Sequence, residues 1–252
     1  MENIYKSVNG SKGFYFGFTT DNEDLEVLRK IIKTHFLRNI AHDFPDLLEV
    51  ATNTSMDRYH QFCESIPHEE YWTKSKRILP KDLLCKFKET HLYRWLHENC
   101  EIAQITGEDL VEDEEVYWRL VRPNAPCDVG PLHADAWFWE LNGDTTPHKD
   151  ERVKVWIPIF TEPGKSGLRY VPGSQSTKVP YNATVRHGKR KPQIQIDLSE
   201  LSEVFYGHPG TPFIFHDRLI HGGAVGGEHT RVSIEFTFHR LSNLNQTGSV
   251  AS

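Results

Sequence analysis

The sequence has little of what marks several classes of protein. Its 252 residues contain only four cysteines, and no two of them form a Cys-x-x-Cys pair, which argues against a zinc ribbon or a thioredoxin-type redox site. No stretch approaches the run of about 18 apolar residues that a transmembrane helix needs. The net charge is −6, so no global positive charge attracts nucleic acid or an anionic membrane. We therefore expect partners that are neither nucleic acid nor membrane.

Targeting signals and linkers are also missing. The segment from Met1 to Lys6 lacks the apolar core of a signal peptide, so we expect a cytoplasmic protein with reduced thiols. Internal repeats and linkers rich in glycine, serine or proline are absent, which favours a single domain over residues 1–252. No sequence feature predicts an oligomeric state.

The first part of this domain, residues 1–113, is expected to be mainly helical. Apolar residues recur at helical spacing after Asp21, which can cap the first turn. A second helix is expected to begin at Pro80, a good first-turn residue, and to place Phe87 and Trp95 on one face. These helices would pack against the rest of the chain.

The second part, residues 114–240, has a different texture, and residues 241–252 form a tail. Short alternating runs are separated by Gly, Pro, Asn and Asp, which predicts an all-β sandwich or barrel. The gaps are too short for the crossover helices of a parallel α/β fold. The expected fold class is therefore α+β, a mainly β core with N-terminal helices. The runs are residues 116–122, 153–160, 193–196, 212–216 and 231–238.

Three side chains in the β part suit a metal ion by type and spacing. The sequence has 14 histidines, and histidine is the commonest protein ligand of transition metals. In His133-Ala134-Asp135, the first and third residues of an extended segment point to the same side, so an imidazole and a carboxylate converge. His221 follows 86 residues after Asp135. Two histidines and one carboxylate form the facial triad of non-haem Fe(II) oxygenases, which leaves open positions on the metal.

Arg231 and Ser233 are candidates for binding the co-substrate of such a metal centre. They share one face of an alternating strand, and a guanidinium with a hydroxyl suits a carboxylate. A keto acid would chelate the iron through two atoms, and Arg231 would hold its far carboxylate with help from Ser233. The predicted cofactors are therefore Fe(II), 2-oxoglutarate and O₂. His216 competes with His221 as the distal ligand, but the ten-residue spacing to Arg231 favours His221.

Longer motifs extend this pattern over most of the chain. They are Leu-His-Ala-Asp at 132–135, Val-Trp-Ile-Pro at 155–158, Ser-Gly-Leu-Arg-Tyr-Val-Pro-Gly-Ser at 166–174, Phe-Ile-Phe-His-Asp-Arg-Leu-Ile-His-Gly-Gly at 213–223, and Arg231. With these motifs the sequence resembles the phytanoyl-CoA dioxygenase-like family of Fe(II)/2-oxoglutarate oxygenases. The resemblance implies a double-stranded β-helix, the jelly-roll core of cupin-like folds. It also implies that the iron ligands and catalytic residues are His133, Asp135 and His221. Arg231 would hold 2-oxoglutarate, and Trp156 would border the co-substrate pocket.

Two positions depart from the pattern of that family. Gln175 stands where a histidine commonly follows Pro-Gly-Ser, and Ala134 stands where several members carry a polar residue that orients 2-oxoglutarate. Neither change removes a ligand, although both bear on the identity of the substrate. Asp135 itself counts against the halogenase variants, in which a small residue leaves room for a halide.

Other features bear on the substrate. Trp137 and Trp139 form either an aromatic wall at the pocket mouth or a hydrophobic cluster at the barrel rim. Residues 142–152 are polar and predict a loop that could serve as a lid. The basic run at 186–191 is either a solvated loop or, with Arg169, an anion site. From the second reading we expect a polar, anionic small molecule as the substrate.

Together these features predict a dioxygenase that hydroxylates an unactivated carbon and releases succinate and CO₂. One alternative is a metal-dependent, cupin-type isomerase or hydrolase that works without 2-oxoglutarate. A second alternative is a non-catalytic jelly-roll module that binds carbohydrate through its tryptophans. A requirement for both 2-oxoglutarate and O₂ separates the first reading from these two.

Overall fold

The computed structural model describes residues 4–107, 113–142, 152–186 and 189–240. Its helices are α1 (Ile4–Val8), α2 (Asn22–Asp43), α3 (Leu48–Asn53), α4 (His68–Tyr71), α5 (Lys74–Arg77), α6 (Lys81–Lys88), α7 (His91–Cys100) and α8 (Asp135–Leu141). Its strands are β1 (Phe14–Tyr15), β2 (Ile102–Thr106), β3 (Val116–Val121), β4 (Arg152–Phe160), β5 (Leu168–Tyr170), β6 (Tyr181–Arg186), β7 (Lys189–Ile194), β8 (Glu203–Phe205), β9 (Phe213–His216), β10 (His221–Gly223) and β11 (Arg231–Arg240). Among the helices of these segments, none is long and apolar enough to cross a membrane.

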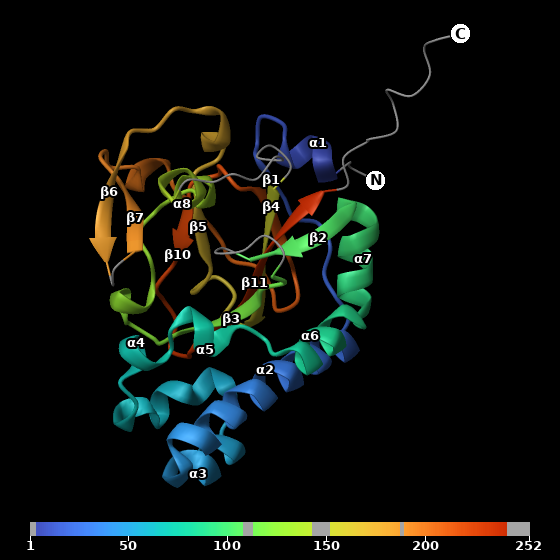
Figure 1. Ribbon diagram of the computed structural model, residues 1–252, viewed down its shortest axis with the longest axis vertical. Helices are drawn as coiled ribbons and strands as arrows, with labels where there is room; N and C mark the ends of the chain where they lie inside the picture. Colours follow the sequence, from blue (N-terminus) through green and yellow to red (C-terminus); the bar gives the residue numbers. More distant parts are fainter. Residues whose placement is uncertain (1–3, 108–112, 143–151, 187–188, 241–252) are drawn as a thin grey trace.

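Two antiparallel sheets form the centre of the fold (Figure 1). The large sheet has the strand order β1-β9-β4-β11-β2, and β3 also pairs with β11. The small sheet has the order β10-β5-β8, and β6 pairs with β7 in a separate hairpin. Strands β1 and β2 come from the part of the sequence expected to be mainly helical, and they join the large sheet beside β9 and β11.

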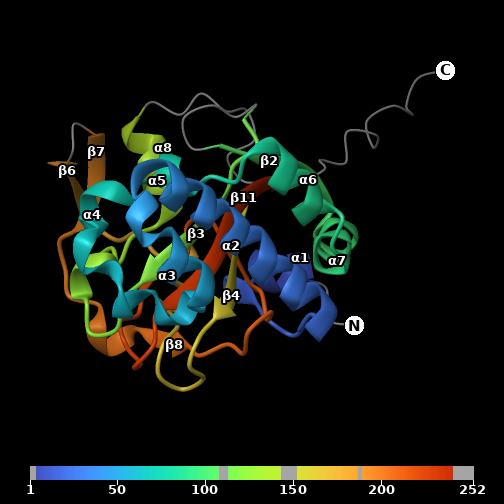
Figure 2. The ribbon, with the colours of Figure 1, turned by 90° about the horizontal axis from the view of Figure 1, so that it is seen from below.

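The helices of the N-terminal part cover one face of the large sheet, with α2 running across it (Figure 2). As the sequence predicts, Asp21 caps α2, because its carboxylate accepts a hydrogen bond of 2.8 Å from the backbone N–H of Asp24. The single helix expected after Pro80 is wrong, because the chain forms α6 and α7 instead. Thr90 caps α7, and its hydroxyl accepts from the N–H of Tyr93 and donates to the carbonyl of Phe87.

Strand β11 gives the large sheet two unlike faces, and nine of its ten residues are buried. Phe236 and Phe238 belong to the hydrophobic core that the sheet shares with the helices. Because successive side chains of a strand alternate, Arg231, Ser233 and Glu235 lie on the opposite face. The polar face is therefore buried inside the sandwich instead of facing solvent.

An aromatic core joins the two sheets on that inner face. Phe213 lies 4.9 Å from Tyr170 and 4.9 Å from Phe205, measured between ring centroids. Trp156 of the large sheet belongs to the same cluster, and its ring centroid lies 6.1 Å from that of Phe205. These contacts fill one part of the space between the sheets, while the charged residues of β11 and β4 occupy another.

The apolar contact between the helices and the large sheet should contribute measurably to the free energy of unfolding. Phe236 is fully buried, and its ring contacts Phe87 of α6 at 5.7 Å between centroids. We expect Phe236→Ala to lower the free energy of unfolding by about 3–5 kcal/mol, because it leaves a cavity. Val185→Ala, at a side chain that is 73% exposed, should change it by less than about 0.5 kcal/mol. Urea unfolding of both variants measures the difference, and equal midpoints would contradict this account of the core.

Candidate metal centre

Two segments that are distant in the sequence meet at the inner face of the sandwich. The backbone N–H of His133 donates to the carbonyl of His221 at 2.9 Å, and the N–H of His221 donates to the carbonyl of His133 at 2.8 Å. This isolated antiparallel bridge places the two residues directly opposite each other. Asp135 follows two residues later as the first residue of α8.

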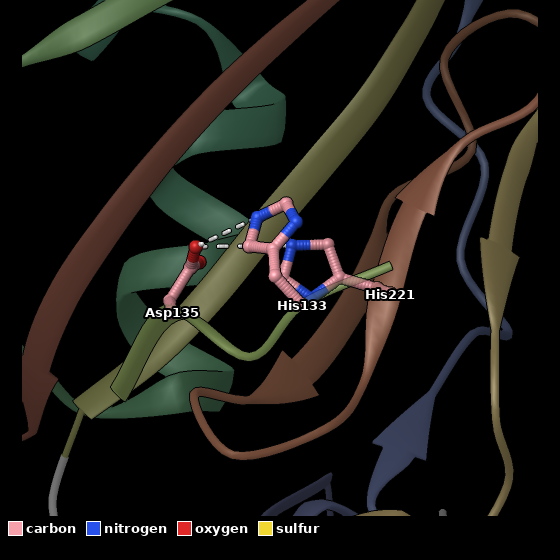
Figure 3. Close-up of side chains that lie close together, drawn as sticks. All are labelled: His133, Asp135 and His221. Carbon is pink, nitrogen blue, oxygen red and sulfur yellow. Dashed lines mark ion pairs between the residues drawn. The ribbon is translucent and has the colours of Figure 1, made fainter. Parts of the chain in front are cut away.

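The three side chains converge, as Figure 3 shows. Oδ1 of Asp135 lies 3.6 Å from Nε2 of His133 and 3.8 Å from Nε2 of His221. One ligand atom from each residue lies within 4.8 Å of the other two, so a single ion can contact all three. The spacing recognised in the sequence therefore corresponds to a real cluster in space.

Local hydrogen bonds orient both imidazoles for metal binding. Nδ1 of His133 lies 2.8 Å from the carbonyl oxygen of Pro131, and Nδ1 of His221 lies 2.9 Å from that of Leu219. A carbonyl can only accept, so each Nδ1 carries the proton and each Nε2 presents its lone pair to the cluster. This is the arrangement of a histidine prepared to ligate a metal ion.

The charge states of the cluster suit a divalent cation. Burial lowers the pKa of His221 to about 4, so the imidazole is neutral at pH 7. Burial opposes the charge on Asp135, but Lys154 and the two imidazoles hold the pKa of this carboxyl well below its usual range. The donor set of one carboxylate and two imidazoles fits Fe(II).

The structure separates His221 from its sequence competitor His216. Nδ1 of His216 accepts a hydrogen bond of 3.0 Å from the backbone N–H of Arg218 and lies 3.1 Å from Oδ1 of Asp217. His216 is not a member of the metal-ligand cluster among the described residues. It stabilises the turn before His221.

Arg231 is buried beside this cluster with no hydrogen-bond partner for any of its three guanidinium nitrogens among the described residues. Its Cζ lies 5.4 Å from the ring centroid of Trp156, whose indole N–H is also buried and unpaired. Burial lowers the pKa of Arg231 to about 10, so the side chain remains charged at pH 7. Glu235 attracts this cation electrostatically but forms no hydrogen bond with it among the described residues. A buried cation without hydrogen bonds is costly, and a carboxylate of a bound ligand would supply them.

Glycine makes room for this guanidinium. A Cβ atom at Gly223 would lie 3.3 Å from Nη2 of Arg231 and 2.6 Å from Cγ1 of Val129. Ser233, by contrast, is already engaged, because its hydroxyl donates to Oε1 of Glu235 at 3.4 Å. The guanidinium of Arg231 therefore retains its capacity to donate hydrogen bonds, whereas Ser233 is oriented toward Glu235.

The two tryptophans lie differently from each other because the chain becomes helical at Asp135. Trp137 is buried and stacks on Tyr181 at 4.4 Å between ring centroids, within a hydrophobic cluster. Trp139 is partly buried, and Cζ of Arg152 lies 4.4 Å from the centroid of the Trp139 ring. On a helix, positions two residues apart do not share a face, so the pair forms no continuous wall.

The remaining substrate candidates are not all brought to the cluster. Arg169 pairs with Gly222 in the small sheet, so alternation places it on the face opposite to Tyr170 and His221, and its Nε donates to the carbonyl of Gly223. Of the loop at 142–152, residues 143–151 lie outside the described residues, as do 187–188 of the basic run.

Comparison with known proteins places the chain in a family. The family model described as phytanoyl-CoA dioxygenase (PhyH) matches residues 48–231. The chain belongs to this family. Its members are oxygenases that depend on Fe(II) and 2-oxoglutarate and consume O₂, so the expected cofactors are those of the family. No curated protein sequence gives a significant match.

Solved structures show the same fold at low sequence identity. The apo form of the non-heme monooxygenase ThoJ is similar with a TM-score of 0.58 and 12% identity, over 95% of this chain and 77% of that chain. The epimerase SnoN, in complex with Fe3+, alpha ketoglutarate and nogalamycin RO, is similar with a TM-score of 0.54 and 12% identity, over 100% of this chain and 91% of that chain. The expected cupin-like core with added helices is confirmed.

Two further residues support the cluster, although no motif in the sequence marks them for this role. Lys154 of β4 is buried, with its Nζ 3.3 Å from Oδ2 of Asp135. Ser174 of the Pro-Gly-Ser motif accepts a hydrogen bond of 2.8 Å from the N–H of Ile220, the residue before His221. The signal for Lys154 was its position two residues before Trp156, which puts both side chains on the inner face of the sheet.

Ser174 offers a test of this support. In Ser174→Ala the buried N–H of Ile220 loses its acceptor, which should lower the free energy of unfolding by about 1–3 kcal/mol. Because His221 is the next residue, the affinity for Co(II) should fall as well. Urea unfolding and a Co(II) titration measure the two effects. Ser176→Ala, at an exposed serine of the same turn, is the matched control, and identical behaviour of the two variants would exclude the positioning role.

Proposed function

We propose that the protein is an Fe(II)/2-oxoglutarate-dependent dioxygenase that hydroxylates an unactivated carbon of a polar, anionic small molecule. The observation that carries the proposal is the presence of a His-Asp-His cluster together with the buried guanidinium of Arg231, which forms no hydrogen bond with any described residue. The cluster suits a metal ion with open positions, and the guanidinium suits the carboxylate of a co-substrate.

In this proposal His133, Asp135 and His221 hold the iron from one side. When bound, the iron and 2-oxoglutarate would supply the activation of O₂ and the oxidation of the substrate carbon, with succinate and CO₂ released. The carbonyls of Pro131 and Leu219 keep the two imidazoles in the ligating tautomer. The chain itself contributes orientation and exclusion of water, and the cofactors contribute the difficult chemistry.

Arg231 would bind the far carboxylate of 2-oxoglutarate. At 2% exposure it forms the pair away from water, where a charge-assisted hydrogen bond is strong. The indole of Trp156 lies against the guanidinium and would border the co-substrate. The same unpaired cation argues against a cupin-type isomerase or hydrolase and against a carbohydrate-binding module, since neither needs a buried anion-binding group.

The anionic substrate of this proposal is supported by cations near α8. This helix begins with the ligand Asp135, and the hairpin of β6 and β7 lies against it in Figure 1. Arg190 of that hairpin reaches the helix, where its Nη1 donates to the carbonyl of Leu141 at 3.1 Å. Lys191 is its neighbour on β7. These cations support an anionic substrate.

The test is succinate formation by the purified protein with Fe(II), 2-oxoglutarate and a panel of anionic metabolites. His133→Ala and Asp135→Ala should abolish turnover, because each removes a metal ligand. Mass spectrometry of the product distinguishes the gain of an oxygen atom in hydroxylation from the loss of two hydrogens in desaturation and from the unchanged mass of an epimer. Product formation without consumption of 2-oxoglutarate would overturn the proposal.

Arg231 gives a separate prediction. Arg231→Met should raise the KM for 2-oxoglutarate by about 100-fold, because loss of a buried charge-assisted partner costs about 2–5 kcal/mol of binding. The value of kcat at saturating 2-oxoglutarate should change less. Arg38→Met removes an arginine that is half exposed and paired with Asp82 on the surface, so it serves as the control. An unchanged KM in Arg231→Met would show that the co-substrate assignment is wrong.

A further inference from the structure

Lys154 is a buried cation that the proposed reaction does not yet use. It lies on β4 between Arg152 and Trp156 on the inner face of the large sheet and is 3% exposed. Its Nζ donates a hydrogen bond of 3.0 Å to the hydroxyl of Tyr117 on β3. Burying an ammonium group is costly. The position of Lys154 beside the carboxylate of Asp135, a member of the metal cluster, therefore needs an explanation.

The two oxygens of Asp135 have different neighbours. Oδ1 is the oxygen closest to the imidazoles, 3.6 Å from Nε2 of His133 and 3.8 Å from Nε2 of His221. Oδ2 lies 3.3 Å from Nζ of Lys154. Within the part of the chain that the structure describes, Oδ2 has no partner in hydrogen-bond geometry, so the contact with the ammonium is one of charge. The carboxylate is thus divided between a metal-facing atom and an atom held by a cation.

We propose that Lys154 is a positioning residue of the metal centre, which holds Oδ2 of Asp135 so that only Oδ1 is offered to the metal. This inference rests on the proposed function of the His-Asp-His cluster. A carboxylate can bind a metal through one oxygen or two. Binding through one oxygen leaves the position that a second would occupy, and a co-substrate that chelates through two atoms needs that position.

The surroundings of Lys154 fix its ammonium in place. In the sheet it pairs with Phe215 of β9 and Thr237 of β11, and Tyr117 holds Nζ from a third strand. Neighbouring strands therefore limit the movement of the side chain. Partners beyond the ligands commonly orient metal-binding groups in this way, and their loss typically costs about 10–100-fold in affinity or activity.

The experiment uses the whole chain loaded with Co(II), whose visible absorption reports coordination number, and measures 2-oxoglutarate binding without turnover. In Lys154→Met, Oδ2 is released and can occupy a second position. The Kd for 2-oxoglutarate should then rise by about 10-fold or more, with a changed Co(II) spectrum. Co(II) should still bind, because its three ligands remain and Oδ2 of Asp135 can contact it as well. Lys154→Arg, which keeps a cation beside Oδ2, should restore most of the affinity.

Controls separate positioning from stability. Lys33→Met makes the same substitution at a lysine of α2 that bonds the carbonyls of Ala51 and Thr54, so it should reduce stability without changing either Kd. Tyr117→Phe removes one anchor of the ammonium and should raise the Kd for 2-oxoglutarate by a smaller factor. If Lys154→Met does not fold, this variant decides the question.

The outcomes are distinct. A wild-type protein that binds no Co(II) would overturn the proposed function, and the inference with it. A folded Lys154→Met protein with a wild-type spectrum and an unchanged Kd for 2-oxoglutarate would overturn the inference alone. Loss of Co(II) binding in this variant would also contradict it, because Lys154 would then build the site instead of orienting one oxygen.

Discussion

The metal centre depends on two backbone hydrogen bonds between His133 and His221, residues 88 positions apart in the sequence. They join the segment before α8 to β10, so each imidazole is placed by the other's backbone. A further backbone bond, from the N–H of Ala136 to the carbonyl of Asp217, fastens the start of α8 to the same turn. The position of Asp135 then follows from the first turn of that helix. Weakening of this bridge would separate the ligands even if every side chain were intact.

Much of the fold and of the candidate site could be predicted from short-range rules. Alternation along β11 places Arg231 and Ser233 on one face without knowledge of the sheet. The cap at Asp21 marks the start of α2 for the same local reason. The choice of His221 over His216 needed only the spacing to Arg231, and the structure brings His221 to the cluster. Each of these inferences depends on a few neighbouring residues.

What the sequence could not predict depends on changes of direction and on distant partners. An extended segment through Trp137 and Trp139 would have put both rings beside the ligands, but the helix that starts at Asp135 turns Trp137 into a hydrophobic cluster. Lys154 stands in an apolar run, and its role appears only when β4 is placed beside α8. Alternation reveals that a face is polar, but only the opposing small sheet reveals that Arg169 lies on the outside.

The arrangement of charge on the inner face explains why Arg231 is left without a partner. Glu235 lies on the same strand and face, but Arg119 of β3 holds it at 3.0 Å. Lys154 stands opposite Asp135 in the same way. Each of these two carboxylates thus already has a cation close to it, and among the described residues Arg231 has no hydrogen-bond partner. A dianionic co-substrate has one carboxylate for the metal and one for this guanidinium. The two charges of such a co-substrate offset those of a divalent metal ion, and its far carboxylate would give Arg231 the hydrogen-bonded partner that it lacks among the described residues.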